Sequence, residues 1–383
     1  ALIQKGGLPM QQIVASMLAK AGQYLRRERS FKGLTYEIRE EKADRAVIED
    51  SAAIMRAIIR FDAAKQKAVK TIQDDVSAEG GAIGYDGAAG RAGAESTNFT
   101  SIMHNLVNQT LLALKIPAAV QAAKEAAARD EKPVLTVSNT MESMLDNYIE
   151  ARDIKVGDVI NADFRDLYER YLERTREVRT KKPWSKEKVK VSRLTDEQLA
   201  GGNEIITVEG VPTTREPSAL RAYAQAYTLI RNAGFENLPF SPIDKLRYEL
   251  EKAGLKTGEI TGREKIIAYS GDQGPTLKLR PGKEIKAAGK IATLKSYNDG
   301  RIDALILNRS GSSGLSAHAS PKTGTDVRQR HMIVVQAELN IDTHVQILGR
   351  VHRTGQVVVP RYTQLISDVP AEKRPSAVLA KKM

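Results

Sequence analysis

The chain has 383 residues, a formal net charge of +12 at pH 7 and no cysteine. Its length exceeds the size at which one core usually stops growing, so we expect two or three folded units. The missing cysteine excludes disulfides and thiolate metal sites, and with no convincing histidine cluster we expect no metal. The positive charge favours an anionic partner, nucleic acid first, although a merely basic, solvated surface predicts the same composition.

The first third of the sequence is typical of helices. Apolar residues at helical spacing predict three helices, over residues 9–29, 43–69 and 100–128. A short strand is expected from Ser30, where apolar and polar residues alternate. Residues 76–96 are rich in Gly and Ala and predict a flexible loop. We therefore expect residues 1–130 to form a mainly helical region.

A change of pattern at Lys132 marks the start of an α/β region. A strand over 133–139 and a helix over 141–150 open it, and the charged, irregular stretch 151–215 predicts an inserted element or a basic arm. The later elements alternate: a helix from Ser241 and Pro242 to a stop at Gly254, a strand in GEITGR, a helix over 289–297, strands over 303–308 and 331–338, a helix over 343–353, and a strand over 361–367. This order predicts an α/β fold over residues 131–383, with a parallel sheet and helices on both faces.

The strongest chemical pattern lies in the stretch THVQILGRVHRTGQ, residues 343–356. On a helix, Gln346, Arg350 and Arg353 share one face, with Gly349 at its edge. The opposite, apolar face is formed by Ile341, Val345, Leu348 and Val351. Two guanidinium groups on one rigid face suit phosphoryl transfer, where an arginine finger stabilises charge on the γ-phosphoryl oxygens. A surface helix with solvated arginines is the alternative.

A loop of small residues follows the predicted strand at 303–308. Backbone N–H groups and hydroxyls of such a loop can approach a phosphate closely. The candidate residues are Ser310, Gly311, Ser312, Ser313 and Gly314. A simple Ser/Gly turn would have the same composition.

The QxxGRxxRTGQ pattern of residues 346–356 resembles the last conserved motif of superfamily 2 helicases and translocases. The resemblance implies a RecA-like domain in which Arg353 is the arginine finger, Arg350 contacts a phosphate, and Gln346 couples the nucleotide to nucleic acid. It also implies that Gly314, Ser316 and Gly349 lie on the nucleotide side. The residues implied to contact nucleic acid are Thr136, Ser138 and Asn139, together with Ser310 to Ser313.

Several segments together resemble the strawberry notch family of helicase-like proteins, including its bacterial and phage-borne relatives. They are SFKGLTYEI, the helix with His104 and KIPAAVQAAKEA, SPIDKLRYELEKAG with GEITGR, SSGLSAHA, and the final QILGRVHRTGQVVVPRYTQLISDVPAEKR. The resemblance covers most of residues 20–383 and implies the C-terminal half of such a protein. One departure is Ser316, where many superfamily members have an acidic residue.

The sequence contains no P-loop, because PGKEIKAAGKIA has the wrong spacing and Ile291 where a Mg²⁺-binding hydroxyl is required. There is also no acidic tetrad at the end of an apolar strand. We therefore expect ATP with Mg²⁺ to be held mainly by a RecA-like domain or chain upstream, and we expect this chain alone not to hydrolyse ATP. Nucleic acid, with DNA ahead of RNA, is the other expected partner.

A rival reading is a non-catalytic nucleic-acid-binding or structural component of a phage or mobile element. The basic stretch 180–193 and the missing P-loop favour it. A third reading makes the parent protein an antirestriction factor. No apolar run reaches about 18 residues and no signal peptide is visible, so we expect no membrane contact. The expected location is the bacterial host cytoplasm, with carriage in a phage particle as a further option.

Overall fold

The computed structural model describes residues 33–78, 93–96, 99–181, 190–269, 274–309 and 314–382, together with Met17 and Lys20. The chain divides into two compact units, residues 1–35 and 36–383. Everything below concerns the second unit. Within the described residues, no helix is both long enough and apolar enough to cross a bilayer.

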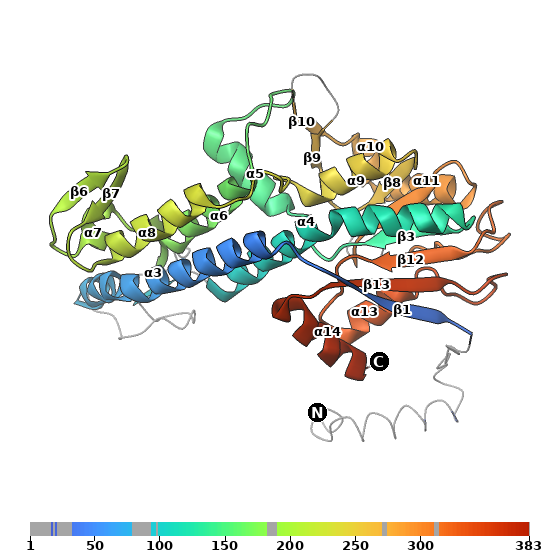
Figure 1. Cartoon of the computed structure of the whole chain (residues 1–383), viewed down its shortest axis with the longest axis horizontal. Coiled ribbons are helices and arrows are strands. Elements are labelled where there is room, and N and C mark those ends of the chain that lie inside the picture. The colour runs from blue at the N-terminus through green and yellow to red at the C-terminus, as the bar shows by residue number, and fades with distance from the viewer. Residues whose placement is uncertain are drawn as a thin grey trace. The chain divides into compact units, whose positions relative to one another are not determined.

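A six-stranded sheet forms the centre of the α/β part of the chain (Figure 1). In spatial order its strands are β1 (Thr35–Glu41), β13 (Arg361–Ser367), β12 (Arg330–Val334), β3 (Lys132–Thr136), β11 (Ala304–Leu307) and β8 (Thr257–Ile260). The five strands from β13 to β8 are parallel, with Val134 of β3 paired to Met332 on one side and Leu305 on the other. This confirms the α/β fold and the parallel sheet that the alternating pattern predicts.

Helices cover both faces of this sheet (Figure 1). On one face, α4 (Phe99–Ala128) and α9 (Pro242–Lys252) pack against strand side chains such as Leu135 and Ile306. On the other, α11 (Ala287–Asn298) places the Tyr297 hydroxyl on the Lys132 carbonyl, at 3.2 Å. The same face receives α13 (Ile341–Leu348), since the Tyr362 hydroxyl donates to the carbonyl of Leu348 at 3.0 Å. The layered arrangement that the sequence predicts is therefore present.

The predicted helices of the first third are present where the structure describes them. They are α3 (Arg45–Ala78) and α4, while the predicted helix 9–29 lies outside the described residues apart from Met17 and Lys20. The predicted loop 76–96 is wrong at both ends, because residues 76–78 continue α3 and β2 spans Gly93–Ser96. Residues 79–92 lie outside the described residues.

The described part of the charged stretch 151–215 is folded into short helices and strands between β3 and β8. Its elements are α6 (Phe164–Thr175), β4 (Glu177–Lys181), β5 (Lys190–Arg193), α7 (Asp196–Ala200), β6 (Ile205–Val208) and β7 (Val211–Thr214). A capping box at Asp163 starts α6, whose Leu167 and Tyr171 are fully buried. Few apolar residues suffice here because their helical spacing puts them on one face.

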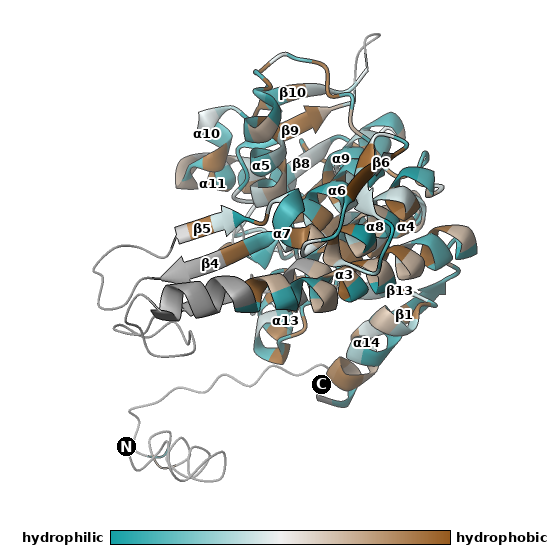
Figure 2. Cartoon of the chain, turned by 90° about the vertical axis from the view of Figure 1, so that its left-hand side faces the viewer, coloured by the Kyte–Doolittle hydropathy of each residue, from teal (hydrophilic) through white to brown (hydrophobic). Residues whose placement is uncertain are grey.

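A second core lies among helices and is separate from the sheet core. It joins α3, α5 (Glu142–Arg152), α6 and α8 (Ala219–Asn232), whose hydrophobic and hydrophilic residues interleave along their length (Figure 2). The ring of Phe61 meets that of Tyr223 edge-on, with the centroids 5.6 Å apart. Helix α4 contributes Leu106 to this core and Leu112 to the sheet core. The two cores therefore do not divide at residue 130, where the change of pattern places the boundary.

Three further elements follow β8. They are β9 (Lys265–Ala268), β10 (Thr276–Leu279) and α10 (Gly282–Ile285). Strands β9 and β10 pair antiparallel and send Ile267 and Leu277 into the helical core. Helix α14 (Pro370–Lys382) follows β13 and holds Glu372, which forms an ion pair with the buried Lys115 of α4.

Candidate functional site

The carboxyl ends of β3, β11 and β12 lie at one edge of the sheet. The chain runs from β11 across β3 to β12, so neighbouring strands in space are not neighbours in sequence. Loops that leave such an edge are the usual ligand-binding positions of parallel sheets. The loops after β3 and β11 carry most of the predicted site residues.

The predicted arginine helix is shorter than expected. The Asn340 side chain caps α13 by accepting from the Thr343 N–H at 3.0 Å, and the helix ends at Leu348 with Gly349 as its C-cap. Arg350 and Arg353 therefore lie beyond the helix, and the predicted shared face with Gln346 does not form. Gly349 keeps a right-handed conformation with φ of −65°, so the helix ends here without the left-handed glycine that stops many helices.

The packed face of α13 also differs from the prediction. Its buried residues are Thr343, His344, Ile347 and Leu348. Val345, predicted to pack, is 41% exposed, whereas Val351 is buried as expected. Gln346 is exposed on the turn that precedes Gly349. The helix is therefore rotated relative to the assignment made from the sequence.

The two arginines nevertheless come together by another route. Arg350 Nη1 lies 3.3 Å and Arg353 Nη2 3.1 Å from the carbonyl oxygen of Leu315, in the loop after β11. The backbone N–H of Ala317 donates to the Arg350 carbonyl at 2.8 Å. The loop after α13 is thus fastened to the loop after β11, and both guanidinium groups converge on one neutral acceptor.

The electrostatics of this arginine pair favour an anion. Burial, and then the neighbouring charge of Arg353, lower the pKa of Arg350 below its ordinary value. The Nε of Arg350 is buried and has no hydrogen-bond partner among the described residues. Two cations held close together gain stability from an anion that accepts from both. A phosphate group fits the chemistry of this donor set.

The loop after β11 is only partly described. Ser310, Gly311, Ser312 and Ser313 lie outside the described residues. Gly314 has φ of 77°, a left-handed conformation that favours glycine. The Ser316 carbonyl accepts from the Asn298 side chain at 3.2 Å, which anchors the loop to the end of α11. This places Gly314 and Ser316 directly beside Leu315, the acceptor of the arginine pair.

The loop after β3 is organised by a residue that the sequence did not single out. The side-chain oxygen of Gln336, just after β12, accepts from the N–H groups of Ser138 at 3.1 Å and Asn139 at 3.4 Å. The Asn139 amide donates to Asn105 of α4 at 3.2 Å. Ser138 and Asn139 stay half-buried at the sheet edge, whereas Thr136 is 1% exposed and its hydroxyl is enclosed. A polar residue ending a buried strand was the only signal for Gln336.

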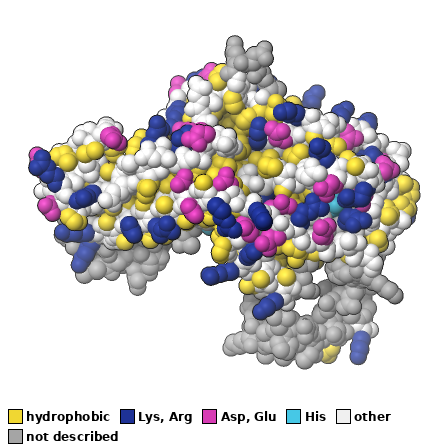
Figure 3. Space-filling model, viewed as in Figure 1, with side chains coloured by type: hydrophobic (Ala, Val, Ile, Leu, Met, Phe, Trp, Pro, Cys, Tyr) yellow, Lys and Arg dark blue, Asp and Glu magenta, His cyan; other side chains and the backbone are white. Residues whose placement is uncertain are grey.

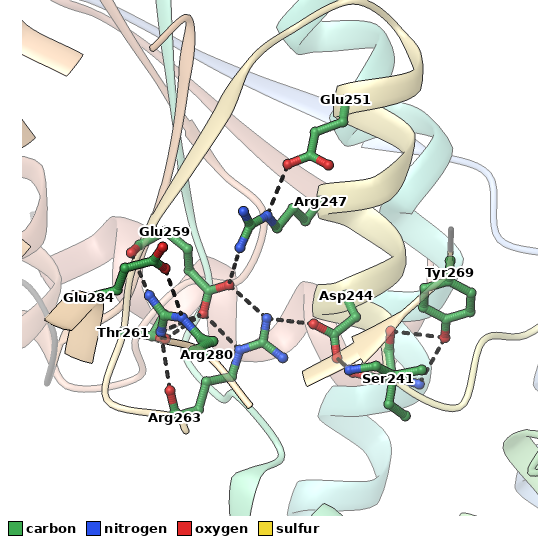
Figure 4. Close-up of polar contacts among 11 residues, drawn as sticks. Ser241, Asp244, Arg247, Glu251, Glu259, Thr261, Arg263, Tyr269, Arg280 and Glu284 are labelled. Carbon is green, nitrogen blue, oxygen red and sulfur yellow. Dashed lines mark hydrogen bonds and ion pairs between the residues drawn. The ribbon is translucent and has the colours of Figure 1, made fainter. Parts of the chain in front are cut away.

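A second arginine pair lies buried beside β8, in a charge cluster formed by Asp244, Glu259, Thr261, Arg263 and Arg280 (Figure 4). Arg263 binds Glu259 through two hydrogen bonds of 2.7 Å and pairs with Asp244 at 2.6 Å. Arg280 donates to the Thr261 hydroxyl at 3.0 Å and to the Glu259 carbonyl at 2.9 Å. The GEITGR segment thus connects β8, α9 and β10 through side chains that solvent does not reach.

Glu259 of this cluster is strongly held in its charged form. Burial alone would raise the pKa of Glu259, but the charges and hydrogen bonds of Arg263 and Arg280 outweigh it and lower that pKa to about 2. Asp244 is further fixed by the Ser241 hydroxyl at 2.7 Å and the Ile267 N–H at 2.8 Å. Ser241 was predicted as the cap of α9. Its hydroxyl donates to Asp244 instead and makes no side-chain cap bond. Among the described residues, no group of His, Asp and Glu side chains is arranged to hold a metal ion.

Comparison with known proteins connects the sheet part of the chain with one family. Residues 241–383 match the family model described as the C-terminal domain on strawberry notch homologues. The match contains both arginine pairs and the strands β8, β11, β12 and β13. Residues 241–383 are therefore similar to a strawberry notch C-terminal domain. They form a helicase-like domain, as the sequence motifs predict.

Individual strawberry notch relatives are much longer than this chain. Strawberry notch of Drosophila melanogaster is 28% identical over 195 residues, which are 49% of this chain and 12% of that protein. FORGETTER 1 of Arabidopsis thaliana is 27% identical over 171 residues, 44% of this chain and 13% of that protein. Human strawberry notch homolog 2 is 22% identical over an alignment covering all of this chain and 31% of that protein. The chain therefore spans between about an eighth and a third of these relatives.

One solved structure aligned with the chain is the C-terminal part of the Fun30 ATPase domain. The alignment covers 90% of this chain and 89% of that one, at 13% sequence identity and a TM-score of 0.32.

Proposed function

We propose that this chain supplies the arginine half of an ATP-hydrolysing site in a helicase-like motor. The observation that carries the proposal is the convergence of Arg350 and Arg353 on the Leu315 carbonyl at the carboxyl edge of the sheet. The nucleotide and its Mg²⁺ would be held mainly by another RecA-like domain, because this sequence contains no P-loop. Closure of the two domains would bring the arginines to the γ-phosphate.

Each residue near the arginine pair has a proposed role in this site. Arg353 acts as the finger that stabilises charge on the transferring phosphoryl group, and Arg350 binds a phosphate oxygen. Gly314, Ser316 and Gly349 lie along the two loops that the Ala317 to Arg350 hydrogen bond joins. ATP would supply the reacting phosphoryl group. Guanidinium groups suit it because they donate two parallel hydrogen bonds and remain charged at neutral pH.

Nucleic acid would be gripped at the same edge of the sheet. Ser138 and Asn139 lie on the loop after β3, and we include Ser310, Gly311, Ser312 and Ser313 because they are small and three of them carry a hydroxyl. Thr136 would need to move before it could reach a strand, since its side chain is buried. Gln346 is exposed on α13 and would couple nucleotide to nucleic acid. We propose DNA ahead of RNA and a cytoplasmic setting.

The experiment that tests the proposal uses a protein in which this chain is joined to a P-loop domain. Changing Arg353→Ala should lower the nucleic-acid-stimulated rate of ATP hydrolysis by about 10³-fold, because an arginine finger supplies rate of that order. Arg353→Lys should recover only a small part of it. The matched control is Arg301→Ala, an exposed arginine paired with Asp299 outside the site, which should leave the rate unchanged.

A non-catalytic nucleic-acid-binding or structural role, including an antirestriction role in a phage or mobile element, is the competing proposal. It predicts that the joined protein binds nucleic acid but hydrolyses no ATP above background. Retention of full ATPase activity by Arg353→Ala would instead show that the arginine assignment is wrong. Salt-dependent binding to DNA and RNA oligomers would decide between the two nucleic acids.

A further inference from the structure

The side chain of Gln336 lies between the loop after β3, residues 137–141, and helix α4, and it is only 7% exposed. Its amide oxygen accepts from the backbone N–H groups of Ser138 and Asn139, at 3.1 and 3.4 Å. Its amide nitrogen donates to the carbonyl oxygen of Asn108 in α4, at 2.8 Å. Since the oxygen of an amide only accepts and its nitrogen only donates, these contacts fix the side chain in one orientation.

The main chain of Gln336 is bound to the same part of the molecule. Its N–H donates to the carbonyl oxygen of Thr136, the last residue of β3, at 3.2 Å. Gln336 therefore joins the ends of two neighbouring strands to the loop and to α4. An apolar side chain at this position would fill the space but would leave the two loop N–H groups without their acceptor.

The loop has a backbone shape that its surroundings must hold. Met141, its last residue, has φ of 61°, which lies in the left-handed region and is uncommon for a residue with a long side chain. The N–H of Met141 donates to the side-chain oxygen of Asn139 at 2.8 Å, and the Asn139 amide donates to Asn105 of α4 at 3.2 Å. Contacts around such a residue offset its strain, and Gln336 supplies those at the start of the loop.

Few groups of this loop remain available to a ligand. The N–H groups of Ser138 and Asn139 are occupied by Gln336, and the Asn139 side chain is bound to α4 and to the end of the loop. The Ser138 side chain is half-buried at the carboxyl edge of the sheet, where parallel sheets bind their ligands. Its hydroxyl donates to Gln336 over a long 3.4 Å, so it can turn to an acceptor on a ligand.

We infer that Gln336 is a positioning residue for nucleic-acid binding, which holds the loop after β3 so that the Ser138 hydroxyl reaches a phosphate or sugar oxygen of one strand. Asn139 supports the same loop from its other end. The inference rests on the proposed function, which places nucleic acid at this edge. On the face drawn in Figure 3, Lys and Arg side chains are interspersed with Asp and Glu, so placed polar groups matter there beside net charge. A hydroxyl contact of this kind fixes the strand without reading its bases.

The first measurement is hydrogen exchange of the 383-residue chain without ligand, followed by mass spectrometry on a peptide that contains residues 137–141. In Gln336→Met, exchange in this peptide should rise about tenfold or more, while the strands of the sheet core stay as protected as in the wild type. The matched control is Gln329→Met at the other end of β12, where Gln329 donates to the Val359 carbonyl at 2.8 Å. It should leave the peptide unchanged. Faster exchange throughout the sheet core of Gln336→Met would mean that Gln336 holds the whole fold, and would overturn the inference.

The second measurement is the binding of a labelled single-stranded oligonucleotide of about 20 nucleotides, by fluorescence anisotropy without ATP, at about 200 mM salt to weaken non-specific attraction. Gln336→Met and Ser138→Ala should each weaken binding about tenfold, and Gln329→Met by less than about twofold. The milder variant Gln336→Asn keeps an amide that is too short to reach both sides, and it should weaken binding about threefold. In a chain that already carries Ser138→Ala, Gln336→Met should add less than about twofold, because a positioning residue loses its effect once the group that it positions is gone.

The remaining outcomes separate this inference from the proposed function. Losses that simply add in the double variant would overturn the inference, because Gln336 would then act by another route. Unchanged binding by Gln336→Met beside a loss for Ser138→Ala would also overturn it and would leave the nucleic-acid contact in place. Unchanged binding by Ser138→Ala would show that the proposed contact itself is wrong, and the inference with it. Because no ATP is present, none of these results depends on the arginine assignment.

Discussion

Two arginine pairs within residues 241–383 lie in opposite electrostatic settings. Arg263 and Arg280 lie in the buried charge cluster, where Glu259 and Asp244 supply two negative charges. Arg350 and Arg353 share the neutral carbonyl of Leu315. The pKa shifts of Arg263 and Arg350 differ accordingly, although burial lowers the pKa of Arg280 as well. Burial would lower the pKa of Arg263, but Asp244 and Glu259 raise it above its ordinary value, whereas burial and Arg353 lower that of Arg350.

The difference shows how one residue type serves structure in one place and ligand binding in another. A buried cation with its own carboxylates, such as Arg263, holds strands and helices together. A half-buried cation beside a like charge gains most from an anion that arrives from outside. The neighbours, and not the arginine itself, thus distinguish the two roles.

The largest effect expected from this comparison is on stability at the charge cluster. Arg263→Ala leaves Glu259 and Asp244 buried without their main partner and should lower the free energy of unfolding by about 3–5 kcal/mol. Urea denaturation would measure it. Arg301→Ala, which removes the exposed pair with Asp299, is the matched control and should cost no more than about 1 kcal/mol. A similarly small cost for Arg263→Ala would mean that the buried pair does not stabilise the fold.

The pH dependence of the free energy of unfolding extends the comparison to the buried side chain of His331. His331 lies 2.9 Å from Glu131 and 2.8 Å from the Thr363 hydroxyl, and burial lowers its pKa from 6.5 to about 4. The unfolded chain takes up this proton near pH 6.5 and the folded chain only near pH 4. The free energy of unfolding should therefore fall as pH falls through this window, by at most about 3 kcal/mol.

The variant His331→Gln isolates this contribution. Its free energy of unfolding should change less than that of the wild type between pH 6.5 and pH 4, as followed by circular dichroism in urea. Parallel curves for the two proteins would mean that His331 keeps an ordinary pKa.

The smallest expected effect is at the ligand-facing pair. Arg350→Ala removes one of two repelling charges along with some packing, so the free energy of unfolding should change by less than about 1 kcal/mol in either direction. The same urea experiment measures it beside Arg263→Ala. A cost of about 3 kcal/mol for Arg350→Ala would place both pairs in the same structural class and break the comparison.

The sheet was predictable because its strands are short apolar runs that alternate with amphipathic helices. The apolar composition of runs such as 303–308 and 361–367 by itself predicts that they are buried. The stretch 151–215 was not predictable in the same way, since the apolar residues that fold it are sparse among charges. Leu167 and Tyr171 gain their burial from α3 and α8, which are distant in sequence. Tertiary partners of this kind leave no local signal.

The sequence predicted the correct two arginines but placed them on a helix, whereas they lie in the loop after α13. Helical spacing put Arg350 and Arg353 on one face, but the helix ends at Leu348, and both side chains instead contact the Leu315 carbonyl. Gln336 and the partners of Arg263 were missed for a common reason. Their contacts join segments between which the sequence shows no pattern.

Helix α4 belongs to both cores, and this bears on how the chain acquires its structure. Leu106 faces the helical core while Leu112, less than two turns further on, faces the sheet core. Fraying of either half would uncover part of the same helix and weaken the other half. The helical core and the sheet core should therefore form one cooperative folding unit. A fragment that begins at residue 131 would lack α4, and the part of the sheet core that α4 covers would be exposed.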